Sequence, residues 1–172
     1  MSDTEAARGS PFWRFSLGFY RMPEVAENCI ALQDQAGVDV NLLMFLLWNA
    51  TQKRQASKAD VENLERRIGE WRNAAVIPLR EIRRRLKTPP AVMDPGTAEV
   101  FRNRIKAAEL EAERLQQETM YGLAQSFGAP ASSPADAARV SVASYQAICP
   151  KPFPPAAVER LLTAFAKFEM RE

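Results

Sequence analysis

Histidine is absent from this chain of 172 residues. Its absence removes the commonest general base, and with it the usual serine and cysteine triads and HExxH zinc sites. It also removes the Glu-x-x-His ligands of di-iron bundles. Glycine is scarce, and no glycine-rich phosphate loop, GxSxG or GxGxxG motif occurs. The sequence therefore favours a protein that is not an enzyme, and it predicts no catalytic residue, no cofactor and no bound metal.

Long apolar runs and paired cysteines are also missing. The run from Leu42 to Trp48 has seven apolar residues, whereas a transmembrane helix needs roughly 18. The first ten residues carry Asp3 and Glu5, and no apolar signal core follows them. Two cysteines lie far apart and form no CxxC motif, which is typical of buried thiols in a reducing compartment. We therefore expect a cytoplasmic protein without a transmembrane segment.

The composition is that of a folded protein, with 47% hydrophobic and 26% charged residues. The length suits one domain with a sizeable core. We expect a flexible tail over residues 1–9 and a single all-α domain over residues 10–172. The net charge is only +2, but residues 51–90 hold eleven basic and five acidic residues. The basic excess is therefore confined to one segment.

Helix start and stop signals are frequent. Ser10 and Ser133 each precede a proline, a pattern typical of an N-cap followed by the first helical residue. Gly37 stands where a C-terminal glycine cap belongs, and Asp39 is placed to cap the next helix. These signals predict helices over residues 11–22, 23–36, 40–51, 134–148 and 155–168. The helix at 40–51 is apolar all round, which predicts the centre of a bundle.

Two longer helices are predicted from their apolar periodicity. The first stripe has a mean step of about 3.6 residues; its members are Val61, Leu64, Ile68, Trp71, Ala75, Leu79, Ile82 and Leu86. Because it keeps its phase across Pro78, we expect one helix over 57–87 that is kinked there, with a break at 74–77 as the alternative. The second helix is expected over 97–127; its stripe is Phe101, Ile105, Ala108, Ala112, Leu115, Thr119, Leu123 and Phe127. The short proline-rich loop between them predicts an antiparallel pair in a bundle-like fold of about seven helices.

The segment REIRRRLK is the strongest polar feature. Four of its side chains are candidates for binding a partner or a phosphate, namely Arg80, Arg83, Arg84 and Lys87. Arginine forks suit phosphate oxygens on nucleic acid or an anionic surface. The alternative is a solvated helix end that complements the helix dipole.

The segment FWRFSLGFY, from Phe12 to Tyr20, has five aromatic residues in nine. It fits a docking helix that inserts into a partner or a membrane surface. The alternative is an N-terminal helix wedged between others.

Two polar groups complete the candidates. Asp34, Asp39 and Asn41 cluster at a predicted helix junction and are candidates for a polar pocket. Asp39 also serves as a cap, and Asn41 as an inward link between chain segments. The ELEAE segment carries Glu109 and Glu113 on one helix face, which is typical of a solvated helix surface rather than of a metal site.

The blocks FWRFSLGFY, CIALQDQAGVDVNLLMFLLW and WRNAAVIPLREIRRRLK, in this order and spacing, resemble a family of small proteobacterial proteins known as a domain of unknown function. The resemblance covers residues 11–90 well and the C-terminal half loosely. It places Trp13, Asn41, Trp48, Trp71 and Arg80 at family-like positions. It implies a bacterial, cytoplasmic protein and brings no reaction, ligand or catalytic residue.

The resulting hypothesis is a helical interaction or adaptor protein that binds another protein through its basic helix or its aromatic N-terminal helix. One alternative is a nucleic-acid or anionic-surface binder that uses the same arginines. The other is a small-ligand or enzymatic pocket between helices near Asn41 and Trp48.

Overall fold

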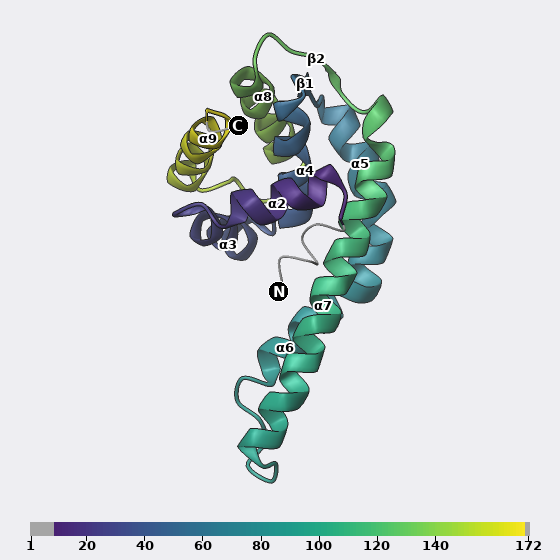
Figure 1. The fold of residues 1–172 in the computed structure, drawn as a ribbon, viewed down its shortest axis with the longest axis vertical. Coiled ribbons are helices and arrows are strands. Elements are labelled where there is room, and N and C mark those ends of the chain that lie inside the picture. The colour runs from purple at the N-terminus through teal and green to yellow at the C-terminus, as the bar shows by residue number, and fades with distance from the viewer. Residues whose placement is uncertain (1–8, 171–172) are drawn as a thin grey trace. The chain divides into compact units, whose positions relative to one another are not determined.

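The computed structural model describes residues 9–170 and shows an all-α protein with one very small sheet (Figure 1). The predicted tail at residues 1–9 lies almost wholly outside the described residues. The elements are α2 (Pro11–Tyr20), α3 (Val25–Ala36), α4 (Val40–Thr51), β1 (Arg54–Gln55), α5 (Lys58–Trp71), the π-helical turn η1 (Arg72–Val76), α6 (Ile77–Arg85), α7 (Pro95–Leu123), the 3-10 turn η2 (Ala124–Ser126), β2 (Ala129–Pro130), α8 (Pro134–Gln146) and α9 (Pro155–Glu169).

The predicted helix caps are confirmed. The Ser10 hydroxyl accepts the N–H of Trp13, and the Ser133 hydroxyl accepts the N–H of Asp136. Gly37 ends α3 with a φ of 72°, in the left-handed region that favours glycine. Asp39 Oδ1 accepts the N–H groups at the start of α4. Local side-chain chemistry therefore fixes these helix ends.

Two helix starts differ by two residues from the predicted positions. The second helix begins at Val25 and not at Pro23, because Glu24 has a left-handed backbone with a φ of 68° that cannot continue a helix. The long helix α7 begins at Pro95 and not at Thr97. Asp94 Oδ2 accepts both the N–H and the hydroxyl of Thr97, so the Asp-Pro-Gly segment is a cap and a first turn.

Residues 9–65 and 117–170 belong to one compact unit, whose core is built around α4. Every side chain from Leu42 to Leu47 is buried, as the apolar pattern predicts. The aromatic residues of α2 pack into the same core. Phe12 meets Phe45 edge to face with ring centroids 5.3 Å apart, and Phe19 meets Phe165 in the same way. The helix is therefore wedged among others, and only Tyr20 of its aromatics is clearly exposed.

Polar links between distant segments hold this unit together. The N–H of Asp39 donates to the Tyr145 hydroxyl at 2.8 Å, and the N–H of Ala56 donates to the Ser141 hydroxyl at 2.9 Å. Strand β1 pairs antiparallel with β2. Gly128 precedes β2 with a φ of 74°, and a Cβ there would stand 2.8 Å from the Gln55 carbonyl oxygen. Only glycine fits that close approach.

Residues 66–116 form a second compact unit, called here the hairpin. The prediction of a single domain over 10–172 stays a prediction. Within the hairpin the helix runs from α5 through η1 into α6 without a break, as expected. The irregularity lies at the π turn just before Pro78, where the Ile77 N–H donates to the Arg72 carbonyl five residues back. The wider turn accommodates the proline, which has no N–H and would clash with the Ala74 carbonyl.

The π turn also changes which side chains face inward. A π turn adds one residue, so the inward positions move forward by one. Before the turn Ile68 is buried, as predicted; after it Val76 is buried in place of Ala75, and Ile82 is exposed. The predicted unbroken phase of the stripe is therefore wrong beyond residue 72.

Candidate interaction surface and pocket

An ion-pair cluster joins α6 to α7 inside the hairpin and consists of Arg80, Arg83, Glu109 and Glu113. Arg80 donates from Nε to Glu109 at 3.1 Å and from Nη2 to Glu113 at 2.6 Å. Arg83 donates from both Nε and Nη2 to the two oxygens of Glu109. Two guanidinium forks thus converge on one carboxylate, the geometry that makes arginine–carboxylate pairs strong.

The cluster explains why Glu109 is charged although it is only 5% exposed. Burial of the carboxyl opposes its ionisation, but hydrogen bonds and charges from Arg83 and Arg80 outweigh burial, so the pKa of Glu109 is lowered. The hydrogen bond to Glu109 likewise raises the pKa of Arg83. The expectation of a solvated surface at Glu109 is therefore wrong, because this side chain faces α6.

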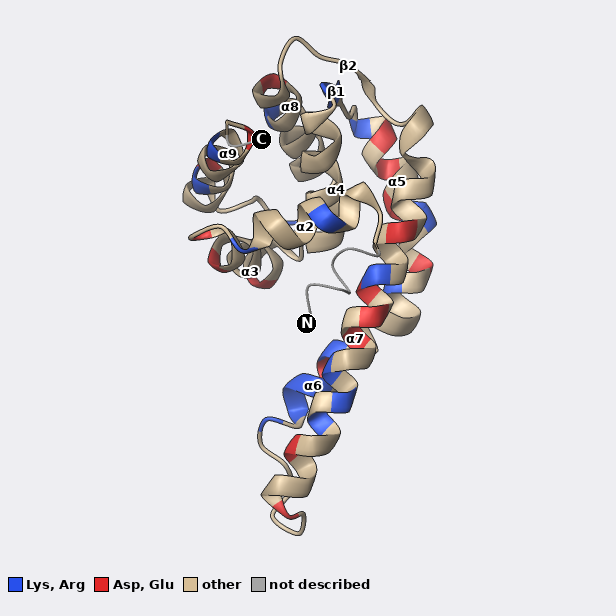
Figure 2. Cartoon of the chain, viewed as in Figure 1, with Lys and Arg blue, Asp and Glu red and all other residues tan. Residues whose placement is uncertain are grey.

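The predicted basic site divides into two parts in the structure. Arg80 and Arg83 direct their donors to carboxylates of the same hairpin. Arg84 and Lys87 lie on the exposed surface. Basic residues are frequent in this region, as the blue parts of the ribbon along α6 and the adjacent part of α7 show in Figure 2. Residues 66–116 carry twelve Lys and Arg against seven Asp and Glu, whereas the rest of the chain is net acidic.

The opposite side of the hairpin carries an apolar flank that the sequence reading assigned to the core. Arg80 and Glu113 lie on one edge of the two antiparallel helices. Helical periodicity places the apolar side chains of α6 and α7 together on the other edge. Trp71 marks the same edge, because its indole N–H donates across to the Ala112 carbonyl at 3.0 Å. The apolar flank comprises Trp71, Leu79, Ile82, Leu86, Phe101, Ala108 and Leu115.

The flank is largely exposed. Ile82 keeps 43% of its surface and Phe101 keeps 49%. Among the described residues, eight of the twelve exposed large apolar side chains belong to residues 66–116. Four of the eight lie on the flank, namely Trp71, Ile82, Phe101 and Leu115. Clustered exposure of this kind marks interaction sites rather than ordinary surface. The predicted burial of Phe101, Ala108 and Leu115 is wrong because the inward face of α7 carries Glu109 instead.

The predicted polar pocket of Asp34, Asp39 and Asn41 stays a prediction, and none of these residues lines the pocket described below. Asp34 is exposed, while Asp39 is buried as a helix cap. Asn41 is buried, and its Oδ1 accepts a hydrogen bond from Gln117 Nε2 at 2.7 Å. Asn41 therefore links α4 to α7, as an inward-pointing residue was expected to do. Asp39 and Asn41 therefore have separate structural roles.

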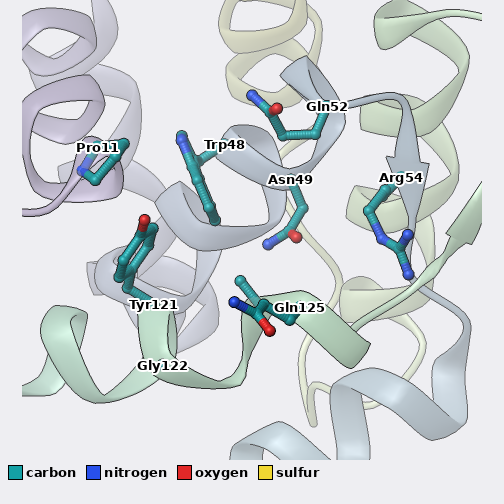
Figure 3. A pocket seen from close by; sticks show the side chains of 9 residues that line it. Pro11, Trp48, Asn49, Gln52, Arg54, Tyr121, Gly122 and Gln125 are labelled. Atoms are coloured by element: carbon teal, nitrogen blue, oxygen red, sulfur yellow. The ribbon is translucent and has the colours of Figure 1, made fainter.

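A pocket of about 470 Å³ lies at the C-terminal end of α4 (Figure 3). It is called here the aromatic pocket, and its lining residues are Pro11, Trp48, Asn49, Gln52, Arg54, Tyr121, Gly122, Ala124 and Gln125. They come from α2, α4, β1, α7 and η2, so no single sequence motif marks them. The sequence reading reached Trp48 as a pocket residue but missed Asn49, Arg54 and Tyr121.

Within residues 9–170, no cluster of three or more acidic, cysteine or histidine side chains has an arrangement that holds a metal ion. No helix in that range combines the length and the apolar content of a membrane span.

Comparison with known protein families assigns the chain to one of them. The family described as "Protein of unknown function (DUF2390)" matches residues 11–120, from the start of α2 to near the end of α7. The match covers well over half of the chain, so the chain belongs to this family. It includes the whole hairpin and the Trp48 wall of the aromatic pocket. Searches of curated proteins and of solved structures found no match.

Proposed function

We propose that this protein is a helical interaction protein and that its hairpin binds an acidic amphipathic helix of a partner protein. The observation that carries the proposal is the exposed apolar flank on a basic hairpin. Trp71 and Leu86 are 15 residue steps apart, or about 22 Å at 1.5 Å per residue. That length suits a helix of about four turns with apolar residues at i, i+3, i+4 and i+7.

Charge indicates which partner fits. The exposed Arg85 lies one helical turn from Ile82, and the exposed Arg104 lies one turn from Phe101. A second copy of the same hairpin would bring another basic excess against them, which disfavours self-association. Acidic residues beside an apolar helix face complement this rim, steer the encounter and raise the association rate.

The ion-pair cluster supports a protein partner over a phosphate ligand. Arg80 and Arg83 are held by Glu109, so they keep the two helices in register and offer fewer donors to an outside phosphate. The surviving alternative is an anionic surface or nucleic acid bound through Arg84, Arg85 and Lys87. We also propose that the protein is cytoplasmic, a location that suits a protein partner.

The test uses a photo-crosslinking residue at position 101 in the full chain, applied to the native lysate, followed by mass spectrometry of the adduct. Peptides from the crosslinked segment are then titrated against purified variants. Ile82→Asp places a charge on the flank. Ile77→Asp is the matched control, because Ile77 has a similar exposure of 37% but lies on the other edge of α6.

We expect an acidic amphipathic segment whose affinity falls about 30-fold or more with Ile82→Asp, as at a binding hot spot. Ile77→Asp should bind as the unmodified chain does. Equal losses in the two variants would contradict the proposal. Steeply salt-dependent binding to DNA, RNA or anionic vesicles without a protein adduct would favour the anionic-surface alternative.

A further inference from the structure

The aromatic pocket has a wall that suits a planar ring. The rings of Trp48 and Tyr121 lie 5.4 Å apart at an interplanar angle of 57°, and Figure 3 shows them side by side at one end of the pocket. Both residues are partly exposed and line the pocket, so part of each ring can be reached by a ligand. Offset or tilted stacking against such faces is a favourable way to hold an unsaturated ring. The volume of about 470 Å³ lies within the range of small-molecule sites.

Asn49 adds a fixed hydrogen-bond acceptor. Its side chain lines the pocket, yet the residue is only 2% exposed. Its Nδ2 donates to the Phe45 carbonyl at 2.9 Å, which fixes the orientation of the amide. The carbonyl oxygen Oδ1 makes no hydrogen bond within residues 9–170. Figure 3 shows this oxygen on the side of Arg54 and the amide nitrogen on the side of Tyr121. Because Oδ1 keeps some contact with solvent, a ligand N–H that enters the pocket can donate to it.

Arg54 sets the charge of the pocket. Its Nε donates to the Phe127 carbonyl and its Nη2 to the Gly128 carbonyl, both at 2.7 Å. These bonds hold the guanidinium in place, and Nη1 makes no hydrogen bond to the residues that the structure describes. The lining contains no Asp or Glu, so a carboxylate or phosphate is favoured there.

We propose that the aromatic pocket binds a small planar heterocycle that carries a ring N–H and an anionic group, either carboxylate or phosphate. The ring stacks on Trp48 and Tyr121, its N–H donates to Asn49, and its anion accepts from Arg54. This site lies in the compact unit built around α4 and does not depend on the hairpin's partner.

The test follows the indole N–H signal of Trp48 in two-dimensional NMR spectra of the full chain, assigned with a Trp48→Phe variant. Three probes share one ring: uracil is neutral, orotate carries a carboxylate, and uridine monophosphate carries a phosphate. We expect orotate or uridine monophosphate to shift the signal and to bind about tenfold or more tightly than uracil, since hydrogen bonds to charged groups are the stronger ones. Which of the two binds identifies the anionic group.

Glycine variants keep the test independent of stability. A Cβ on Gly122 meets nothing within 4 Å, so Gly122→Leu places its side chain in the pocket without disturbing the helix. Gly69→Leu is the matched control, because Gly69 is also helical and lies outside the pocket. We expect Gly122→Leu to abolish probe binding and Gly69→Leu to preserve it, while Arg54→Gln removes the preference for the anionic probes. Absence of any shift at millimolar probe, a shift that survives Gly122→Leu, or equal affinity for uracil would overturn the proposal.

Discussion

Glu109 is the side chain whose replacement tests the hairpin most directly. It accepts from both Arg80 and Arg83 and is almost fully buried. Glu109→Gln keeps the shape of the side chain but removes its charge. Among the described residues, Arg83 then loses its carboxylate partner, and Arg80 keeps Glu113. The two guanidinium groups are then left with one carboxylate, that of Glu113, where two carboxylates had balanced their charge.

The magnitude follows from burial. Breaking a buried ion pair costs about 3–5 kcal/mol, because it leaves an uncompensated charge. The side chains of Arg80 and Arg83 are 20% and 22% exposed, so water screens part of that cost. We expect the hairpin to lose about 2–3 kcal/mol. Its protected amides should then exchange about 30- to 150-fold faster.

The matched control is Glu111→Gln, the same substitution two residues further along α7. Glu111 pairs with Arg114 on the exposed surface, with side-chain exposures of 55% and 37%. Such pairs contribute at most about 0.5 kcal/mol. The stability of the hairpin in both variants is measured by amide hydrogen exchange of residues 76–112. Urea unfolding followed by circular dichroism gives a second measurement. If the two variants destabilise the hairpin equally, the reasoning about the cluster is refuted.

The same cluster predicts a pH dependence. The pKa of folded Glu109 lies below the ordinary value of 4.5. Protons therefore bind the unfolded chain more readily, and the stabilisation is present above about pH 4.5 and lost as pH falls through the lower, folded value. Glu109→Gln should remove this part of the acid transition, whereas Glu111→Gln should leave it in place.

Two further predictions concern the unit built around α4. Tyr145→Phe keeps the ring contact but removes the hydroxyl that accepts the Asp39 N–H, so the free energy of unfolding in urea should fall by about 1–3 kcal/mol; an unchanged value would show that the bond contributes nothing. Burial raises the pKa of the Cys29 thiol to about 12, so a disulfide reagent at pH 8 should modify the half-buried Cys149 first and Cys29 only in urea. Equal rates in the native chain would contradict the burial of Cys29.

Much of the fold was predictable because its signals are local. Serine, aspartate and glycine at helix ends act through hydrogen bonds within three or four residues, so Ser10, Gly37, Asp39 and Ser133 are readable from sequence. The apolar α4 is equally clear, since a helix without a polar face has to be surrounded.

The candidate sites were less predictable. One extra residue in the π turn before Pro78 rotates α6, which exposes Ile82 and turns Arg83 toward Glu109. The sequence did hold a signal for the cluster. Two arginines, Arg80 and Arg83, lie one turn apart on one predicted helix, and two glutamates, Glu109 and Glu113, lie one turn apart on its antiparallel partner. Pairs of these glutamates were considered only with residues of the same helix and not with the arginines of the other helix.

The sequence by itself determined the helical class, most helix ends and the identity of the central helix, because short-range hydrogen bonds and apolar content specify them. The tertiary structure decided which faces meet. It paired Glu109 with two arginines, left Phe101 outside, and brought Trp48, Arg54 and Tyr121 from three elements to one pocket. The physical reason is that burial and ion pairing depend on neighbours far along the chain, and a shift of one residue in a helix turns each side chain by about 100°.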